Sequence, residues 1–370
     1  MRTMQQAGVA MQFPDEIGFI FNPCKIYLTH RNLAQVAVTV TDGTTTQEQT
    51  FEAAKGKIRA DIRAMVQSCF DGVRYGRVEY GTEASSSGVG KEIEVSVEAR
   101  NENNAGELEV ATTFEFTVFY IWGALAVGEV YNGFRTLTYF RGYPFTVGLY
   151  NDSPNGAAII GNDGVATNVI NLGMQGVYDV PLTPDTAKGY YTITDFRGTL
   201  TATTFDDTYD LTFRKIGEGT YTDKVRINIV DGMEGGVYLR WINRHGFTCY
   251  YLFKAGDRQN QVTSSEDIYR NDLADYDESY GYQYASGHKQ THSRQDVLPV
   301  CAPLVDRETW DYLLDAATSP IVDMFMGYDT NGVPRWQGVR IQAGTYTKTS
   351  ATLQDFALNI LLPETPIQSI

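Results

Sequence analysis

Residues 235–254 read GGVYLRWINRHGFTCYYLFK, and this stretch decides the fold class. Two runs of β-branched and aromatic residues, 237–242 and 248–253, flank a polar segment, 243–246, that ends in glycine. Strand-like runs on either side of a turn of this composition predict a β-hairpin. A third alternating run, 225–230, precedes the hairpin and is separated from it by the turn DGMEG. The sequence therefore predicts a three-stranded β-meander.

The hairpin carries large aromatic side chains on both of its strands. We expect Tyr238, Trp241, Tyr250 and Phe253 to form the core of the C-terminal domain, because rings on adjacent strands pack together. Aromatic residues make up 12% of the whole chain, with 24 tyrosines, and 35 glycines supply turns. Tyr, Phe, Val and Thr favour pleated, half-buried surfaces. The composition therefore predicts a mainly β fold, with two to three β-sandwich-like domains and two short helices.

The charge balance of the chain is acidic, with 45 Asp and Glu against 30 Lys and Arg and a formal net charge of −15. This average field repels a phosphate backbone, and no cluster of basic residues offsets it. We therefore expect no direct nucleic-acid partner. No uninterrupted apolar run approaches the roughly 18 residues of a membrane-spanning helix, so we also expect no membrane insertion.

The cysteines and the first residues bear on the compartment. Cys24, Cys69, Cys249 and Cys301 lie far apart and form no C-x-x-C pair. The opening residues, 1–12, lack the apolar core of a secretory signal. We therefore expect buried, reduced thiols in a protein made in a reducing cytoplasm.

Changes in periodicity divide the 370 residues into three expected domains. Residues 1–125 are expected to form an N-terminal β domain, in which apolar residues at helical spacing across 57–70 predict one helix. Residues 126–225 are expected to form a central β-sandwich-like domain, because turn residues interrupt the strand-like runs every 8–12 residues or so.

The third expected domain is a C-terminal β domain, residues 226–370. It contains a long polar loop, 257–296, in which no clear periodicity is visible. It also contains a short helix, 306–317, for which Asp306 is a good N-cap residue.

Two groups of residues in this loop have metal-binding side chains but lack the pattern of a metal site. His288 and His292 have a spacing that suits a metal only on a helix, and their Ser, Gly and Arg neighbours predict a loop. The acidic run 272–278 lacks the alternating acids, central glycine and terminal Glu of a calcium-binding loop. The chain also has no nucleophile elbow and no glycine-rich phosphate loop. We therefore expect no catalytic residue, no metal and no cofactor.

The polar loop is the part of the chain best suited to contact another molecule. Tyrosine offers a large contact area at low entropic cost, together with a hydroxyl group. Such a loop can line a subunit interface, hold a sugar ring, or be an ordinary mobile loop, and the sequence leaves these readings open. The candidate interaction residues are Tyr269, Tyr276, Tyr280, Tyr282, Tyr284, Asp272, Asp275 and Asp277.

Three passages resemble structural proteins of phages and prophages of gut Bacteroidetes. They are YIWGA (120–124) with YFRGYPFTV (139–147), then GVYLRWINRHG (236–246) with YYLFK (250–254), and a set of residues in the tail. The tail set comprises Trp310, Ser319-Pro320, Trp336, GTYT (344–347) and LQDF (353–356), ahead of LLPE (361–364). These are packing and turn signatures, and together they span about residues 115–364.

The resemblance implies a non-enzymatic virion protein of the tail or baseplate, assembled in the cytoplasm of the bacterial host. Its expected partners are further copies of itself, in a homo-oligomeric ring, and other phage tail or neck proteins. A ring also buries strand edges that would otherwise be exposed. The alternative is a virion module that binds host-surface glycan for receptor recognition. A third hypothesis is a polysaccharide hydrolase attached to the virion.

Overall fold

The computed structural model is mainly β and describes two helices, which confirms the predicted fold class. The structure describes residues 1–370 apart from 71–77, 79, 81–84, 104, 130–135, 152–156, 163–164, 172–174, 186–189, 196–197, 204–207, 216–224, 265–266, 270–275, 278–280, 283–286, 290–291 and 364–370. The chain folds into a first unit, Met1–Asp231 with Ile242–Tyr250, and a second unit, Gly232–Trp241 with Tyr251–Ile370. Neither described helix has the length and apolarity needed to cross a membrane.

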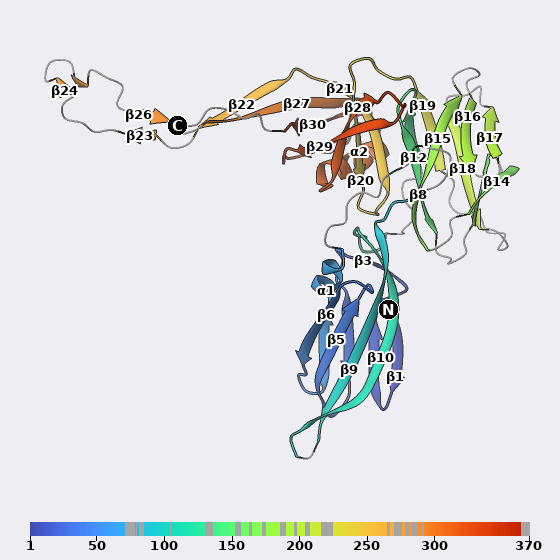
Figure 1. Ribbon diagram of the computed structural model, residues 1–370, viewed down its shortest axis with the longest axis vertical. Coiled ribbons are helices and arrows are strands. Elements are labelled where there is room, and N and C mark those ends of the chain that lie inside the picture. The colour runs from blue at the N-terminus through green and yellow to red at the C-terminus, as the bar shows by residue number, and fades with distance from the viewer. Residues whose placement is uncertain are drawn as a thin grey trace. The chain divides into compact units, whose positions relative to one another are not determined.

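The first unit begins with two sheets that share one core (Figure 1). One sheet has the order β1 (Arg2–Gln6), β2 (Val9–Phe13), β4 (Lys25–Thr29) and β7 (Lys57–Asp61). The other has the order β3 (Ile17–Phe19), β10 (Leu108–Ile121), β9 (Gly90–Glu102), β5 (Leu33–Thr41) and β6 (Thr46–Glu52). In β2, Val9, Met11 and Phe13 are buried while the residues between them are exposed. This alternation directs one face of each strand into the sandwich core.

The helix predicted across 57–70 is present only in its second half. Residues 57–61 form β7, which pairs with β4, and α1 spans Arg63–Ser68. In β7, Ile58 and Ala60 are buried and their neighbours are exposed, which is the period of a strand. A short apolar run can satisfy both periods, and the pairing with β4 decides between them.

Two further sheets follow in the first unit. One has the order β11 (Thr136–Phe140), β19 (Val225–Val230), β18 (Thr208–Lys215), β13 (Ala157–Asn162) and β14 (Val165–Asn171). The other has the order β12 (Phe145–Asn151), β15 (Gly176–Asp185), β16 (Tyr190–Asp195) and β17 (Gly198–Thr203), and β8 (Ser85–Ser86) also pairs with β15.

The hairpin at 235–254 is confirmed as β20 (Val237–Ile242) and β21 (Thr248–Ala255), but the meander prediction is wrong. β19 pairs with β11 and β18, whereas β20 pairs with β21 and β28 (Val322–Tyr328). The boundary between the two units falls after Asp231, so the segment DGMEG leads from one unit into the other. A turn between two strands in sequence does not show that the strands pair.

A buried hydroxyl network joins the tip of this hairpin, residues 242–250, to the rest of the first unit. The Tyr250 hydroxyl lies 2.9 Å from Thr146 Oγ1 and 3.2 Å from the Tyr80 hydroxyl. The hydroxyls of Thr146 and Thr248 each donate to the buried Asp179 carboxylate at 3.3 Å. Tyr250 was expected in the C-terminal core, but it packs in the first unit instead.

A buried histidine holds the other side of the hairpin tip. His245 Nε2 and an Arg244 guanidinium nitrogen lie 3.1 and 2.8 Å from Glu129 Oε1. Burial lowers the pKa of His245, against the opposing effect of Glu129. Burial alone would raise the pKa of Glu129, but the Ala126 N–H and the charges of His245 and Arg244 hold that pKa below its ordinary value.

The second unit is a closed β-barrel. Its strands follow the order β21, β20, β28, β29 (Pro334–Ile341), β30 (Gln354–Leu361) and β27 (His292–Val305), and β27 also pairs with β21. The closing contact is a short ladder in which Lys254 lies opposite Cys301 and Ala255 opposite Val300. Strand spacing alone does not distinguish a barrel from a sandwich, because closure depends on this one long-range pairing.

The helix expected at 306–317 is confirmed as α2 (Arg307–Thr318). Asp306 caps it, since Asp306 Oδ1 accepts a hydrogen bond of 2.8 Å from the Thr309 N–H. Its apolar face covers the barrel, with ring centroids 5.6 Å apart for Trp310 and Phe356 and 5.2 Å apart for Tyr312 and Trp241.

The remaining aromatic residues expected in the core, Tyr238, Trp241 and Phe253, are fully buried in the second unit. All four cysteines are described and reduced; three of them are buried and Cys301 is half-buried.

Candidate interaction surface

The predicted polar loop 257–296 is a two-stranded β-ribbon in its described parts, which corrects the expectation from sequence. We call residues 257–296 the arm. It contains three nested antiparallel ladders: β22 (Gln259–Ser264) with β27, then β23 (Asp267–Tyr269) with β26 (Gly287–Lys289), then β24 (Tyr276–Asp277) with β25 (Gly281–Tyr282). Figure 1 shows β22 and the first part of β27 running beyond the other strands of the barrel.

The first two ladders of the arm share one register. Ser264 lies opposite His292, and Asp267 lies opposite Lys289, so the chain advances equally on both strands. All six residues of β22 are exposed, and the exposed fraction of Val262 is 61%. Because both faces of β22 are exposed, no apolar alternation marks this strand in the sequence.

Polar side-chain contacts, and not a core, hold the base of the arm. One terminal guanidinium nitrogen of Arg294 donates to Asn260 Oδ1 at 2.8 Å, and Arg294 Nε lies 3.1 Å from Asp296 Oδ1. The Thr263 and Ser293 hydroxyls also bond across the two strands. A two-stranded ribbon without a core is marginally stable by itself, and its outer edges can pair with another chain.

The structure describes four of the eight predicted interaction residues. Tyr269, Tyr276, Asp277 and Tyr282 lie on described strands of the arm. Tyr276 and Tyr282 are directly opposite each other in the last ladder, so the structure brings these two positions together. The other four predicted residues, Asp272, Asp275, Tyr280 and Tyr284, lie outside the described residues.

The two histidines of the arm lie on different strands, β26 and β27. His288 lies opposite Ile268 in the second ladder, and His292 is an exposed residue at the start of β27. Within the described ranges, no three His, Cys, Asp or Glu side chains are grouped so that they could hold a metal ion.

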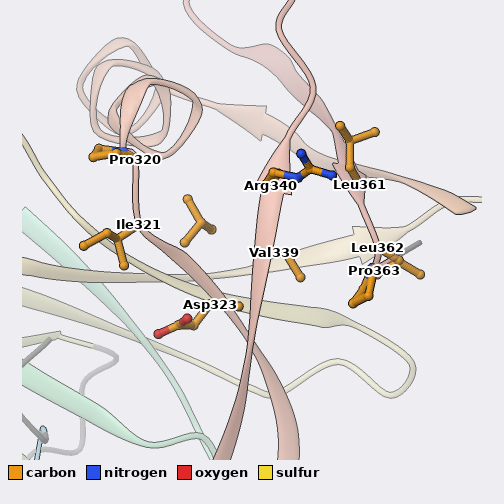
Figure 2. A pocket seen from close by; sticks show the side chains of 10 residues that line it. Pro320, Ile321, Asp323, Val339, Arg340, Leu361, Leu362 and Pro363 are labelled. Carbon is orange, nitrogen blue, oxygen red and sulfur yellow. The ribbon is translucent and has the colours of Figure 1, made fainter. Parts of the chain in front are cut away.

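A second feature of the barrel is an open groove of about 370 Å³. Figure 2 shows Pro320 and Ile321 on one side, Leu361, Leu362 and Pro363 on the other, and Val339 between them. Val322, Asp323, Gly338 and Arg340 complete its lining. The groove thus runs from the start of β28, across β29, to the end of β30, and most of its lining is apolar.

The charged residues beside the groove are held in place by their neighbours. Arg240 Nε donates to Asp323 Oδ2 at 2.9 Å, and both side chains are largely buried. The Arg240 guanidinium also lies 4.4 Å from the centre of the Trp336 ring, a cation–π distance. Arg335 and Arg340, on β29, are exposed.

Sequence reasoning missed this groove, although two signals for it were present. A glycine inside a strand often marks a place where another backbone or a ligand approaches closely, and Gly338 is such a residue. A proline directly after a strand ends its hydrogen-bonding, and Pro363 follows β30 after a single residue. Neither signal shows from sequence that the two residues line the same groove.

Two of the four thiols have a raised pKa. Burial raises the pKa of Cys24 to about 11, and burial likewise raises the pKa of Cys301. Both groups stay protonated near neutral pH, whereas the thiolate is the nucleophile.

No protein-family model and no curated protein matches the chain. Among solved structures, one that concerns the host cell surface retention of a 1.5-MDa bacterial ice-binding adhesin is similar, with 12% identity over 90% of this chain and 97% of that chain. Its TM-score is 0.18, so the likeness carries no argument about fold or function.

Proposed function

We propose that this chain is a non-enzymatic structural protein of a phage virion, associated with the tail or baseplate. It works by self-association and by contacts with other virion proteins. The observation that carries the proposal is the base of the arm, where β22 pairs with β27 and all six residues of β22 are exposed. Such an element contributes little to the stability of the barrel, so we infer that it serves contacts with a neighbour.

The arm can be removed cleanly, which makes the proposal testable. Ser264 and His292 are opposite each other, so replacing residues 265–291 by Asn-Gly leaves a two-residue hairpin of favoured geometry. We expect the wild-type chain to form a defined oligomer, or to rise in mass with concentration, in light scattering. We expect the shortened chain to stay folded and monomeric over the same concentrations.

A matched control is available in the first unit. Thr41 and Thr46 are opposite each other in the β5–β6 hairpin, so residues 42–45 can also be replaced by Asn-Gly. We expect this control to associate as the wild type does. A wild-type chain that remains monomeric, or an arm-deleted chain that associates normally, contradicts the proposal.

A further inference from the structure

The two sheets of the first sandwich carry opposite charges on their outer faces. The sheet β3-β10-β9-β5-β6 turns one face to the shared core and the other to solvent. On the solvent face, Glu48 of β6, Glu94 of β9 and Glu115 of β10 are exposed. The two cations of these strands, Lys91 and Arg100, are already engaged in ion pairs. This outer face is therefore acidic.

The register of the strands brings the acidic side chains together. Glu115 lies opposite Ser96, so it is the diagonal neighbour of Glu94 and Glu98. The pairing of β6 with β5 and of β5 with β9 puts Glu48 in the same row as Ser96. Within the described ranges, Glu48, Glu94 and Glu115 form no ion pair. Their negative potential is not neutralised by the chain itself, so this face attracts a basic surface.

The other sheet of the sandwich, β1-β2-β4-β7, is basic on its outer face. Lys25 on β4 and Lys57 and Arg59 on β7 are exposed and alternate with buried residues, so they point away from the core. The one acid of these four strands is Asp61, which lies 3.1 Å from the backbone nitrogen and 3.7 Å from the guanidinium of Arg63. Among the described residues, Lys25, Lys57 and Arg59 have no carboxylate partner.

We propose that the basic outer face of this sandwich in one copy of the chain binds the acidic outer face of the sandwich in a second copy. The inference rests on the self-association of the proposed function, and it names a second surface that takes part. The two faces lie on opposite sides of one core, so they cannot meet within a chain. Each face is the electrostatic complement of the other, which selects a second copy as the occupant.

This contact and the arm reinforce each other. A copy that is held at one contact presents its second contact at a high effective concentration, so each contact strengthens the other. An electrostatic contact between exposed faces is weak by itself. The arm-deleted chain therefore stays monomeric over the same concentrations, and loss of either contact weakens assembly.

Salt distinguishes complementary faces from the general repulsion between acidic chains. A net charge of −15 makes copies repel one another, and salt screens that repulsion, so association without complementary faces should strengthen with salt. We expect the opposite: association in light scattering should be at least about tenfold weaker at about 1 M than at about 0.1 M NaCl, because the Debye length falls from about 10 to about 3 Å. Association that strengthens or stays constant over this range overturns the inference.

Charge reversal tests the two faces directly. We expect Glu94→Lys with Glu115→Lys, and separately Lys57→Glu with Arg59→Glu, to weaken self-association at least about tenfold in light scattering. A chain that carries all four changes should associate more tightly than either double variant, because the charges are again complementary.

Matched controls place the same changes in net charge on exposed positions of the second unit. They are Glu234→Lys with Glu308→Lys, and Lys254→Glu with Arg335→Glu. We expect each control to associate within about threefold of the wild type. The urea midpoint of every variant shows whether it stays folded.

The outcomes separate the two proposals. If the wild-type chain associates and the arm deletion abolishes this, but both face variants associate as the wild type does, the copies do not meet through these faces and only this inference is overturned. If the wild-type chain stays monomeric at every concentration and salt, the self-assembly of the proposed function fails as well.

Discussion

The Tyr250 hydroxyl gives the sharpest prediction about stability. Its ring is buried, and its hydroxyl lies 2.9 Å from Thr146 Oγ1 and 3.2 Å from the Tyr80 hydroxyl. Tyr250→Phe removes both hydrogen bonds. The Thr146 hydroxyl keeps its longer contact, 3.3 Å to Asp179 Oδ1. At about 1 kcal/mol for each bond, we expect the first unit to lose about 2 kcal/mol.

Hydrogen exchange is the appropriate assay because it reports on each unit separately. A loss of about 2 kcal/mol speeds the exchange of protected amides in β12 and β15 about 30-fold, while the amides of α2 in the second unit are unaffected. A double-mutant cycle with Thr146→Val should give a coupling of about 1 kcal/mol for the shorter bond.

The control for this experiment is Tyr328→Phe, which removes a hydroxyl from a ring that is 45% exposed. We expect its effect to stay within about 0.5 kcal/mol. A Tyr250→Phe variant whose first unit exchanges no more than about twofold faster would refute the argument. Equal acceleration in both units would also refute it, because the network would then not be local to the first unit.

Three further predictions concern titration and helix capping. Burial lowers the pKa of His245 in the folded state, so the unfolded chain takes up this proton first. The free energy of unfolding should therefore fall as the pH drops below 6.5. In His245→Gln, the urea midpoint should depend less on pH between about 7 and 5. Backbone hydrogen bonds, with help from Lys91, lower the pKa of Asp42 from 3.8 to about 2. The stability that this carboxylate adds is complete above pH 3.8 and lost toward pH 2, so Asp42→Asn should reduce the acid sensitivity in that window. Asp306→Ala should cost about 1 kcal/mol in urea unfolding of the second unit, and Asp306→Asn much less, because Asn also caps helices well.

The elements that sequence predicted correctly are those with strong local signals. The helix α2 has a capping residue, Asp306, ahead of apolar residues at helical spacing, and both signals are local. The strands β20 and β21 are dense in β-branched and aromatic residues around a turn. By contrast, Ile58 and Ile62 fit the helical and the strand period equally well, so the error at 57–70 could be resolved only by the pairing of β7 with β4.

The candidate surface was harder to predict, because its signals depend on contacts between distant residues. The tyrosines and acids of the arm led us to expect a contact element, which stays a prediction. Its strands were not predicted, since both faces of β22, Val262 included, are exposed. The groove brings Gly338, on β29, and Pro363, after β30, into one lining, and nothing in the intervening sequence shows this. Local composition thus indicated the arm and missed the groove.

Self-association through the arm, as proposed, also constrains the kind of assembly. If the arm of one copy binds a different surface of the next copy, the contact is heterologous and joins copies head to tail. Such contacts close into a ring if the rotation between copies divides a full turn, and otherwise grow into a filament. A ring leaves no arm unoccupied, whereas a filament always ends in one unoccupied arm. Light scattering of the wild-type chain over rising concentrations should therefore give one fixed mass for a ring, and a mass that keeps rising for a filament.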